Sequence, residues 1–208
     1  MKPNISNKIK NIIFDFGGVI CNIDHLIPER KFKELGIRNF DKMYSQAKQN
    51  NLFEDFEKNL ISPKKFRNNI KSLIDRNISD EQIDEAWNSM ILDIPKNKID
   101  LLLKLKHQYR IFLLSNSNII HYRVYINDFK AKSGLENFSD LFEKAWFSFD
   151  LQMRKPVKEI YEFVLKDANL KPEETLFIDD SIQNIKPAEE LGIQCIFLKN
   201  GMDILNLF

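Results

Sequence analysis

The chain has 208 residues, of which 43% are hydrophobic and 29% are charged, and its formal net charge is +1 at pH 7. This balance is typical of a globular protein rather than a disordered chain, and the length suffices for one α/β domain, or for a core domain with a small insert. A chain so close to neutrality has no general positive field for gripping nucleic acid or an anionic membrane. We therefore expect neither as a partner, and an anionic substrate would need a local site.

Two absences in the sequence bear on location. No stretch approaches the roughly 18 apolar residues of a membrane span, and the apolar run near the N-terminus is too short for a signal sequence and is interrupted by Asp15. A cytoplasmic location is therefore expected. Cys21 and Cys195 lie far apart and form no CxxC or Cys/His cluster, which indicates buried thiols in a reducing compartment.

The first predicted element is a strand at residues 11–16, an apolar run that delivers the carboxylate of Asp15 to its end. Gly17 and Gly18 follow at once, and glycines permit a tight turn and the close approach of a ligand. In open α/β sheets, ligand sites lie at the carboxyl ends of the strands. Taken alone, the pattern fits an ordinary strand-to-turn junction equally well.

Residues 22–94 show helical patterns and no convincing strand. Ser62 and Pro63 indicate the start of one helix, and Ser79 with Gln82 forms a capping box at the start of another. We therefore predict a small α-helical cap at residues 22–94, inserted after the first strand, and a core made of residues 1–21 and 95–208.

Beyond residue 94, strands alternate with helices. Strands are predicted at 110–114, 144–147, 175–178 and 194–198, and most are near-continuous apolar runs that suit parallel strands covered on both faces. One helix is predicted to have Pro156 at its first position, and another to end at Gly192. This alternation predicts an α/β fold with a Rossmann-like, doubly wound parallel sheet.

Polar side chains lie beside three of these strands. Ser115 and Asn116 follow the second strand, where a hydroxyl and backbone N–H groups can hold phosphoryl oxygens. Lys155 precedes a predicted helix, where its charge is unfavourable unless an anion is present. Asp179 and Asp180 follow the fourth strand, and a hard cation with oxygen ligands would relieve their repulsion.

Each of these signals is modest alone, because turns, loops and helix caps use the same residue types. Together they place a nucleophile (Asp15), an oxyanion binder (Ser115), a cation (Lys155) and an acidic pair at the ends of separate parallel strands. These are the parts that phosphoryl transfer through a covalent aspartyl-phosphate needs.

In these four motifs the sequence resembles the haloacid dehalogenase (HAD) superfamily of hydrolases, and the resemblance covers essentially the whole chain. It implies a Rossmann-like core and a mobile cap between the first and second motifs, where the helical insert lies. It further implies that Asp15 is the nucleophile and that Lys155 neutralises the nucleophile and the phosphoryl charge. Ser115 matches the phosphate-binding hydroxyl, and Asn116 follows it in the pattern.

The resemblance also implies Mg²⁺ as the cofactor, held by Asp15, Asp179, Asp180 and the backbone carbonyl of Gly17. Position 17 is also where phosphatases of the family usually carry a second aspartate, which protonates the leaving oxygen and then activates water. General acid–base help of this kind is worth roughly 10²–10⁴ in rate, so the glycine is a consequential departure.

One branch of the family has glycine at this position and includes sugar-phosphate phosphatases, notably glucose-1-phosphatase-like enzymes. Residues 15–20, followed by 22–24, and residues 148–156 resemble that branch, although Gln152 stands where a glycine is expected. Asp24, His25 or a metal-ordered water are the candidates for replacing the missing acid.

We therefore predict a Mg²⁺-dependent phosphatase that acts on a small phosphorylated metabolite, with a sugar phosphate as one candidate. A 2-haloacid dehalogenase-type hydrolase would use the same nucleophile, but it needs no metal and would not explain the acidic pair. A catalytically weak HAD-like protein that binds a ligand or a partner also stays open because of Gly17. Phe53, Phe56 and Trp87 are expected in the cap core more often than in contact with substrate, and the sequence does not indicate an oligomeric state.

Overall fold

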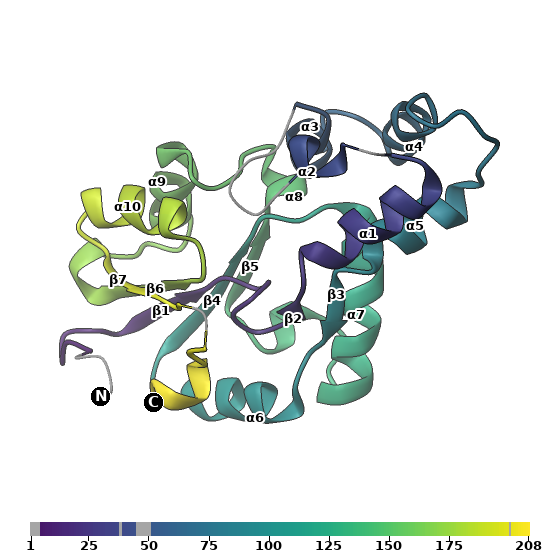
Figure 1. The fold of residues 1–208 in the computed structure, drawn as a ribbon. Helices are drawn as coiled ribbons and strands as arrows, with labels where there is room; N and C mark the ends of the chain where they lie inside the picture. Colours follow the sequence, from purple (N-terminus) through teal and green to yellow (C-terminus); the bar gives the residue numbers. More distant parts are fainter. Residues whose placement is uncertain (1–4, 38, 45–50, 200) are drawn as a thin grey trace.

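The structure, a computed structural model, describes residues 5–37, 39–44, 51–199 and 201–208 (Figure 1). At its centre lies a five-stranded sheet in the order β5-β4-β1-β6-β7, and every neighbouring pair is parallel. The strands are β1 Asn11–Phe14, β4 Arg110–Ser115, β5 Lys144–Phe147, β6 Thr175–Asp179 and β7 Gln194–Phe197. Because the chain builds outward from β1 first on one side and then on the other, the order reverses at β1, where open α/β sheets form their sites. The predicted doubly wound sheet is confirmed.

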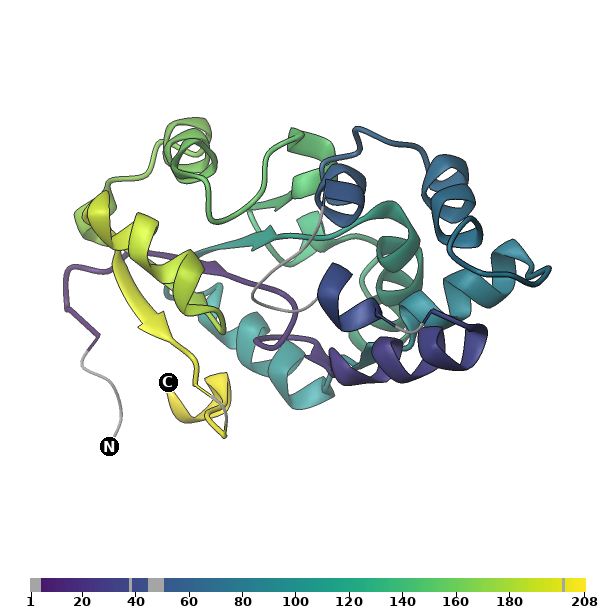
Figure 2. The same ribbon diagram turned by 45° about the horizontal axis from the view of Figure 1, so that its top comes forward.

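Helices cover both faces of this sheet. Alternate residues of β1 point to opposite sides, so that Ile12 and Phe14 join the apolar cluster under α6 and α7, while Ile13 joins the one under α9 and α10. Figure 2 shows α9 and α10 on the side of the sheet away from α6. The helical segments of this part of the chain are α6 Lys96–Leu105, α7 Ile119–Ser133, η1 Phe138–Asp140, α8 Ser148–Leu151, α9 Lys158–Asp167, η2 Pro172–Glu174, α10 Ile182–Glu190 and η3 Ile204–Asn206.

The helix after β5 begins later than predicted. Its N-cap is Val157 and its first residue is Lys158, so the prediction that Pro156 occupies the first helical position is wrong. The reason is that residues 155 and 156 form a turn that carries Lys155 inward, where its side chain is 1% exposed. The predicted stop at Gly192 is confirmed, since α10 ends at Glu190 and the glycine follows with φ +83°.

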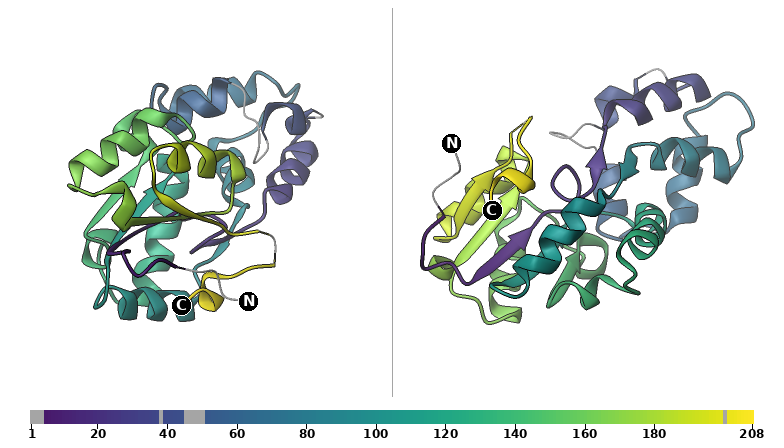
Figure 3. Two further views of the ribbon diagram at one scale, coloured as in Figure 1. Left: turned by 90° about the vertical axis from the view of Figure 1, so that its left-hand side faces the viewer. Right: turned by 90° about the horizontal axis from the view of Figure 1, so that it is seen from below.

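A second group of helices lies beyond the carboxyl ends of the strands (Figures 1 and 3). These are α1 Leu26–Leu35, α2 Phe40–Met43, α3 Asn51–Glu57, α4 Pro63–Lys71 and α5 Asp80–Asn88. They enclose an apolar cluster of their own, in which Phe53, Phe56 and Trp87 are at most 1% exposed. These three side chains belong to the core of the helical group, as expected.

Both helix starts predicted in this group are confirmed. Ser62 accepts the Lys65 N–H, and Ser79 with Gln82 forms both bonds of the capping box. The expectation of no strand in 22–94 is wrong, because β2 Asn22–Ile23 and β3 Ile91–Asp93 pair antiparallel at the base of the group. Strands of two and three residues are too short to show a periodicity. The cap boundary at 22–94 stays a prediction, and residues 38 and 45–50 of that range lie outside the described residues.

Among the described residues, no helix is both long enough and apolar enough to cross a membrane. Cys21 and Cys195 are free thiols; the first is buried, as predicted, and the second is only half-buried.

Candidate active site

The predicted site residues meet at the carboxyl ends of the central strands. Asp15 comes directly after β1, Ser115 is the last residue of β4, and Asp179 is the last residue of β6, with Asp180 next in the chain. Lys155 reaches the same place from the loop between α8 and α9. Parallel strands end at one edge of a sheet, so residues far apart in the sequence are brought together here.

Lys155 links two of these strands. Its Nζ donates to Asp15 Oδ1 and to Asp179 Oδ2, each at 2.7 Å. Burial alone would lower the pKa of the Lys155 ammonium, but the two carboxylates outweigh it and raise that pKa. The lysine is therefore a fixed positive charge beside Asp15.

Asn116 holds the backbone of this lysine. Its side-chain amide donates to the Lys155 carbonyl at 2.8 Å and accepts the Lys155 N–H at 2.9 Å. The HAD pattern places Asn116 with Ser115 among the predicted substrate-binding residues, and in the structure both ends of its amide bond the backbone of Lys155. Asn116 also lines the cavity beside Asp15. Ser115 is 2% exposed, and its hydroxyl lies 3.5 Å from the Asn116 carbonyl, at the outer limit for a hydrogen bond.

Asp179 is fully buried and well supplied with donors. Besides Lys155, its carboxylate accepts the Ser181 N–H at 2.8 Å and the Asn184 side-chain amide at 3.0 and 3.1 Å. Sequence reasoning missed Asn184. Its position in the first turn of the helix that follows the acidic pair was the signal that could have indicated it.

The three carboxylates form a site for a divalent cation. Asp15, Asp179 and Asp180 each offer an oxygen, and these oxygens lie within 4.8 Å of one another. Burial raises the pKa of Asp15 to about 8; the Lys155 charge lowers it in part, and the charges of Asp179 and Asp180 raise it further. With all three carboxylates ionised, they and the one ammonium leave two negative charges, which a hard dication with oxygen ligands would balance. The residues therefore fit Mg²⁺.

The turn after Asp15 depends on its two glycines. Gly18 has φ +77°, and a Cβ there would overlap the Asp180 carboxylate. A Cβ on Gly17 would lie 3.0 Å from Ile23 Cδ1, a tight contact, so a side chain at position 17 would require a small shift of Ile23. From below, the buried Lys98 of α6 supports the turn by donating to the Val19 carbonyl at 2.9 Å.

A cavity of about 100 Å³ lies over these residues, between the core strands and the helical group. Asp15, Gly17, Lys155 and Asp180 line it from the core, and His25, Tyr44 and Glu57 line it from the helical segment. Its lining is mostly polar or charged. Sequence reasoning missed Tyr44 and Glu57, because nothing in the chain order indicates which residues of the helical group face Asp15.

The two side chains among the candidates for the missing acid are placed differently. His25 lines the cavity, and its Nδ1 is buried without a hydrogen-bond partner among the described residues. Burial lowers the pKa of His25, with the charge of Asp24 opposing this in part. Asp24 instead accepts the Leu26 N–H at 2.8 Å, at the start of α1.

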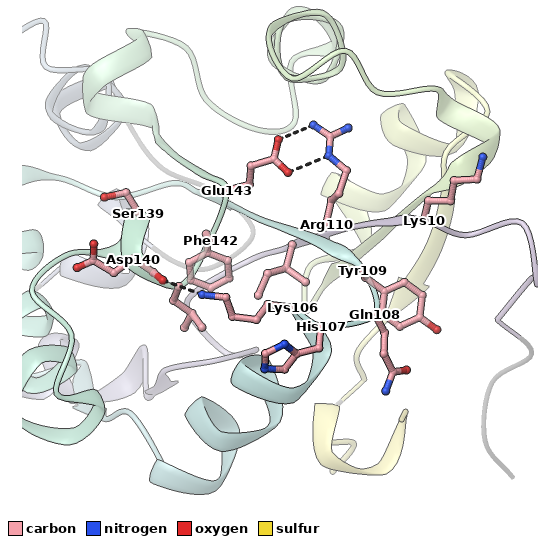
Figure 4. A pocket seen from close by; sticks show the side chains of 12 residues that line it. Lys10, Lys106, His107, Gln108, Tyr109, Arg110, Ser139, Asp140, Phe142 and Glu143 are labelled. Carbon is pink, nitrogen blue, oxygen red and sulfur yellow. Dashed lines mark hydrogen bonds and ion pairs between the residues drawn. The ribbon is translucent and has the colours of Figure 1, made fainter.

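A larger hollow, of about 520 Å³, lies at the opposite end of the sheet (Figure 4). Its basic side chains already have partners: Arg110 forms a two-pronged pair with Glu143, Lys106 donates to the Asp140 carbonyl, and Lys10 bonds Glu174. None of the predicted site residues lines it. The smaller cavity is therefore the candidate active site.

Comparison with known proteins points to one family. A model of haloacid dehalogenase-like hydrolases matches residues 9–192. The D-ribitol-5-phosphate phosphatase of Bacteroides thetaiotaomicron is 33% identical over 94% of this chain and 94% of its own length, and a sesquiterpene phosphatase of Aspergillus oryzae is 26% identical over 93% and 91%. A crystal structure of a HAD family enzyme from Bacteroides thetaiotaomicron, in complex with magnesium and inorganic phosphate, superposes with a TM-score of 0.86 at 42% identity, over 96% of this chain and 99% of that one.

Proposed function

The chain belongs to the haloacid dehalogenase-like hydrolases, and from this premise we propose that it hydrolyses the phosphate monoester of a small polyhydroxylated metabolite, with Asp15 as the nucleophile. That the chain is a magnesium-dependent phosphatase of small phosphorylated molecules follows from its family and its phosphatase relatives. The observation that carries the assignment of Asp15 is the position of Lys155, 2.7 Å from both Asp15 and Asp179.

In the first step, a carboxylate oxygen of Asp15 attacks phosphorus, a new O–P bond forms, and the bond to the substrate oxygen breaks. Lys155 orients the carboxylate and balances part of the charge on the phosphoryl oxygens. Asn116 keeps Lys155 in place through its backbone, and Ser115 with nearby N–H groups binds the phosphoryl oxygens. Water then attacks the aspartyl-phosphate, which releases phosphate and restores Asp15.

Mg²⁺, when bound, supplies positive charge that draws the phosphoryl group towards the nucleophile. Its ligands are proposed to be Asp15, Asp179, Asp180 and the backbone carbonyl of Gly17, which line or adjoin one cavity. Asp15 must be ionised to attack, and the raised pKa in the metal-free site means that charge balance from the cation favours the reactive form.

The proton for the leaving oxygen is proposed to come from His25, directly or through a water. Because burial lowers the pKa of His25, this role requires that the negative charge of the bound phosphoryl group favour the protonated imidazole. A Cβ at position 17 would lie 3.0 Å from Ile23 Cδ1, so a carboxylate at the usual position requires a small shift of that side chain. His25 lines the cavity, whereas Asp24 is engaged at the start of α1. His25→Ala is expected to lower kcat by about 10²-fold, and Asp24→Asn to leave kcat nearly unchanged. Equal kcat values for His25→Ala and the wild type would exclude the histidine.

The cavity favours a small hydrophilic substrate. At about 100 Å³, with Glu57 and Arg154 in its lining, it suits a compact group that can hydrogen-bond. An apolar chain such as a sesquiterpenyl group would displace water from these charged side chains and give them no hydrogen bonds in return, which is costly. The polyol phosphate of one relative therefore fits the cavity better than the terpenoid of the other.

A panel of phosphoesters with Mg²⁺, run beside the Asp15→Asn protein, tests the proposal. We expect turnover of sugar and polyol phosphates that Asp15→Asn lacks and that EDTA abolishes. Activity that resists EDTA would favour dehalogenase-type chemistry. No turnover above the Asp15→Asn control, with ligand binding retained, would favour the binding protein. The glucose-1-phosphatase-like branch and the cytoplasmic location stay predictions.

A further inference from the structure

An ion pair joins the helical group to the loop that carries Lys155. Arg154 Nε donates to Glu57 Oε2 at 2.9 Å, and Glu54 Oε1 lies 3.7 Å from Arg154 Nη1. Glu57 is the last residue of α3, and Arg154 directly precedes Lys155 in the chain. Both side chains of the close pair line the cavity that contains Asp15. The pair is therefore within the space in which the substrate must lie.

The burial of this pair argues against a purely stabilising role. The side chains of Arg154 and Glu57 are 15% and 7% exposed. Desolvation offsets most of the attraction between two charges this deeply buried, so that an apolar pair of similar volume would often stabilise a protein equally well. What an apolar pair could not supply is hydrogen bonding to a ligand in the cavity.

The guanidinium retains donors for such a ligand. Its Nε is used by Glu57, while the contact of Nη1 with Glu54 is too long for a hydrogen bond. Arginine carries five N–H donors in a rigid planar fork. The cavity thus presents N–H donors from Arg154 beside a carboxylate, and a hydroxyl group, which both donates and accepts, can pair with each.

We propose that Arg154 and Glu57 determine substrate specificity by binding hydroxyl groups of the substrate beyond its phosphate, an inference that rests on the proposed phosphatase function. The pair is neutral overall, so it offers no binding site for a second phosphate, which Glu57 and Glu54 would repel. An apolar substrate would leave the pair without the partners that water gives it. Sites that hydrogen-bond a hydroxyl discriminate strongly against analogues that lack it.

The competing interpretation is that the pair only holds the helical group against the core. The two interpretations predict different effects on kcat/KM for different substrates when the pair is changed. If the pair only holds the helical group against the core, its loss should lower kcat/KM for every phosphoester alike, because all need the same closed site. If the pair binds substrate hydroxyl groups, its loss should lower kcat/KM for hydroxylated substrates and leave it unchanged for substrates that have no hydroxyl to bind.

The test compares D-ribitol 5-phosphate with phenyl phosphate in the presence of Mg²⁺, for the wild type, Arg154→Met and Glu57→Gln. We expect kcat/KM for D-ribitol 5-phosphate to fall by about tenfold or more in both variants, mainly through KM, as is usual for a lost hydrogen bond to a charged group. The value for phenyl phosphate should stay within about twofold of the wild type. Glu57→Gln keeps the size of the side chain, so it covers the case in which Arg154→Met fails to fold.

Arg67→Met is the matched control. Arg67 pairs with Asp84 at 2.8 and 2.6 Å, its side chain is 16% exposed, and the pair joins α4 to α5 away from the cavity. It should change neither substrate's kcat/KM. Equal losses on both substrates in Arg154→Met and Glu57→Gln would overturn this inference while the phosphatase assignment stands, as would a wild type that hydrolyses only phenyl phosphate. If the wild type hydrolyses neither compound above the Asp15→Asn level, the proposed function fails and this inference fails with it.

Discussion

The metal-free protein should lose stability as the pH rises, and Asp15 is the reason. The pKa of this buried carboxyl is about 8 in the folded protein, against about 4 for an aspartate in an unfolded chain. A group whose pKa is higher in the folded state binds its proton more tightly there. Its contribution to stability is therefore complete below about pH 4 and is lost as the pH rises through about 8.

The size of the effect follows from the shift in pKa. A difference of about four pKa units corresponds to at most about 6 kcal/mol, at 1.36 kcal/mol per unit. Because Lys155 and the neighbouring acids share the charge at this site, we expect roughly half of that, about 3 kcal/mol in the free energy of unfolding. For a chain of this length, that is a fall in Tm of about 6–12 °C.

Thermal unfolding in EDTA, between about pH 5 and pH 8.5, measures this fall against Asp15→Asn, which has the same size and does not titrate. The difference in Tm between variant and wild type should grow with pH, and saturating Mg²⁺ should remove the fall in the wild type at the alkaline end. Parallel Tm curves for the two proteins in EDTA, or a wild type that gains on the variant as the pH rises, would refute this account of the site.

Three further substitutions probe the same site. Lys155→Met leaves buried carboxylates without their ammonium and should cost about 3–5 kcal/mol, as measured by urea unfolding, together with loss of turnover. Gly18→Ala places a Cβ against Asp180 at φ +77° and should weaken Mg²⁺ activation at least tenfold in a metal titration, whereas an unchanged titration would mean that the carboxylate is not a ligand. Gly17→Asp should give no gain in kcat unless Ile23→Ala is introduced as well, since the Cβ would lie 3.0 Å from Ile23; a gain in the single variant would show that the isoleucine yields readily.

The sequence predicted the sheet because the strands are short, mostly apolar runs, and three of them lead into a distinct polar group. Asp15, Ser115 and Asp179 each follow such a run, so the same residues that define the strand ends also define the site. The sequence also predicted the start of a helix correctly where a side chain caps the backbone, as at Ser79. These signals lie within a few neighbouring residues, so they can be recognised without knowledge of the tertiary structure.

The features that were missed depend on how distant segments approach one another. Nothing near Glu57 in the sequence indicates that it meets Arg154, because the contact spans the helical group and the core. Asn116 is a second case. An amide after a strand can bind a ligand or a backbone, and only the position of the Lys155 turn determines that it binds the backbone here. The same turn delayed the helix that was expected to start at Pro156.

The glycine at position 17 is explained only when the sequence and the structure are considered together. The sequence shows that the usual second acid is missing, and this could mean a weak enzyme. The structure shows that the space is not vacant, because Ile23 of β2 packs against the glycine. Two residues later the same segment brings His25 into the cavity. The segment that begins with this short strand therefore crowds position 17 and places an imidazole in the cavity that Asp15 lines, which is the arrangement that the proposed relocation of the proton donor to His25 needs.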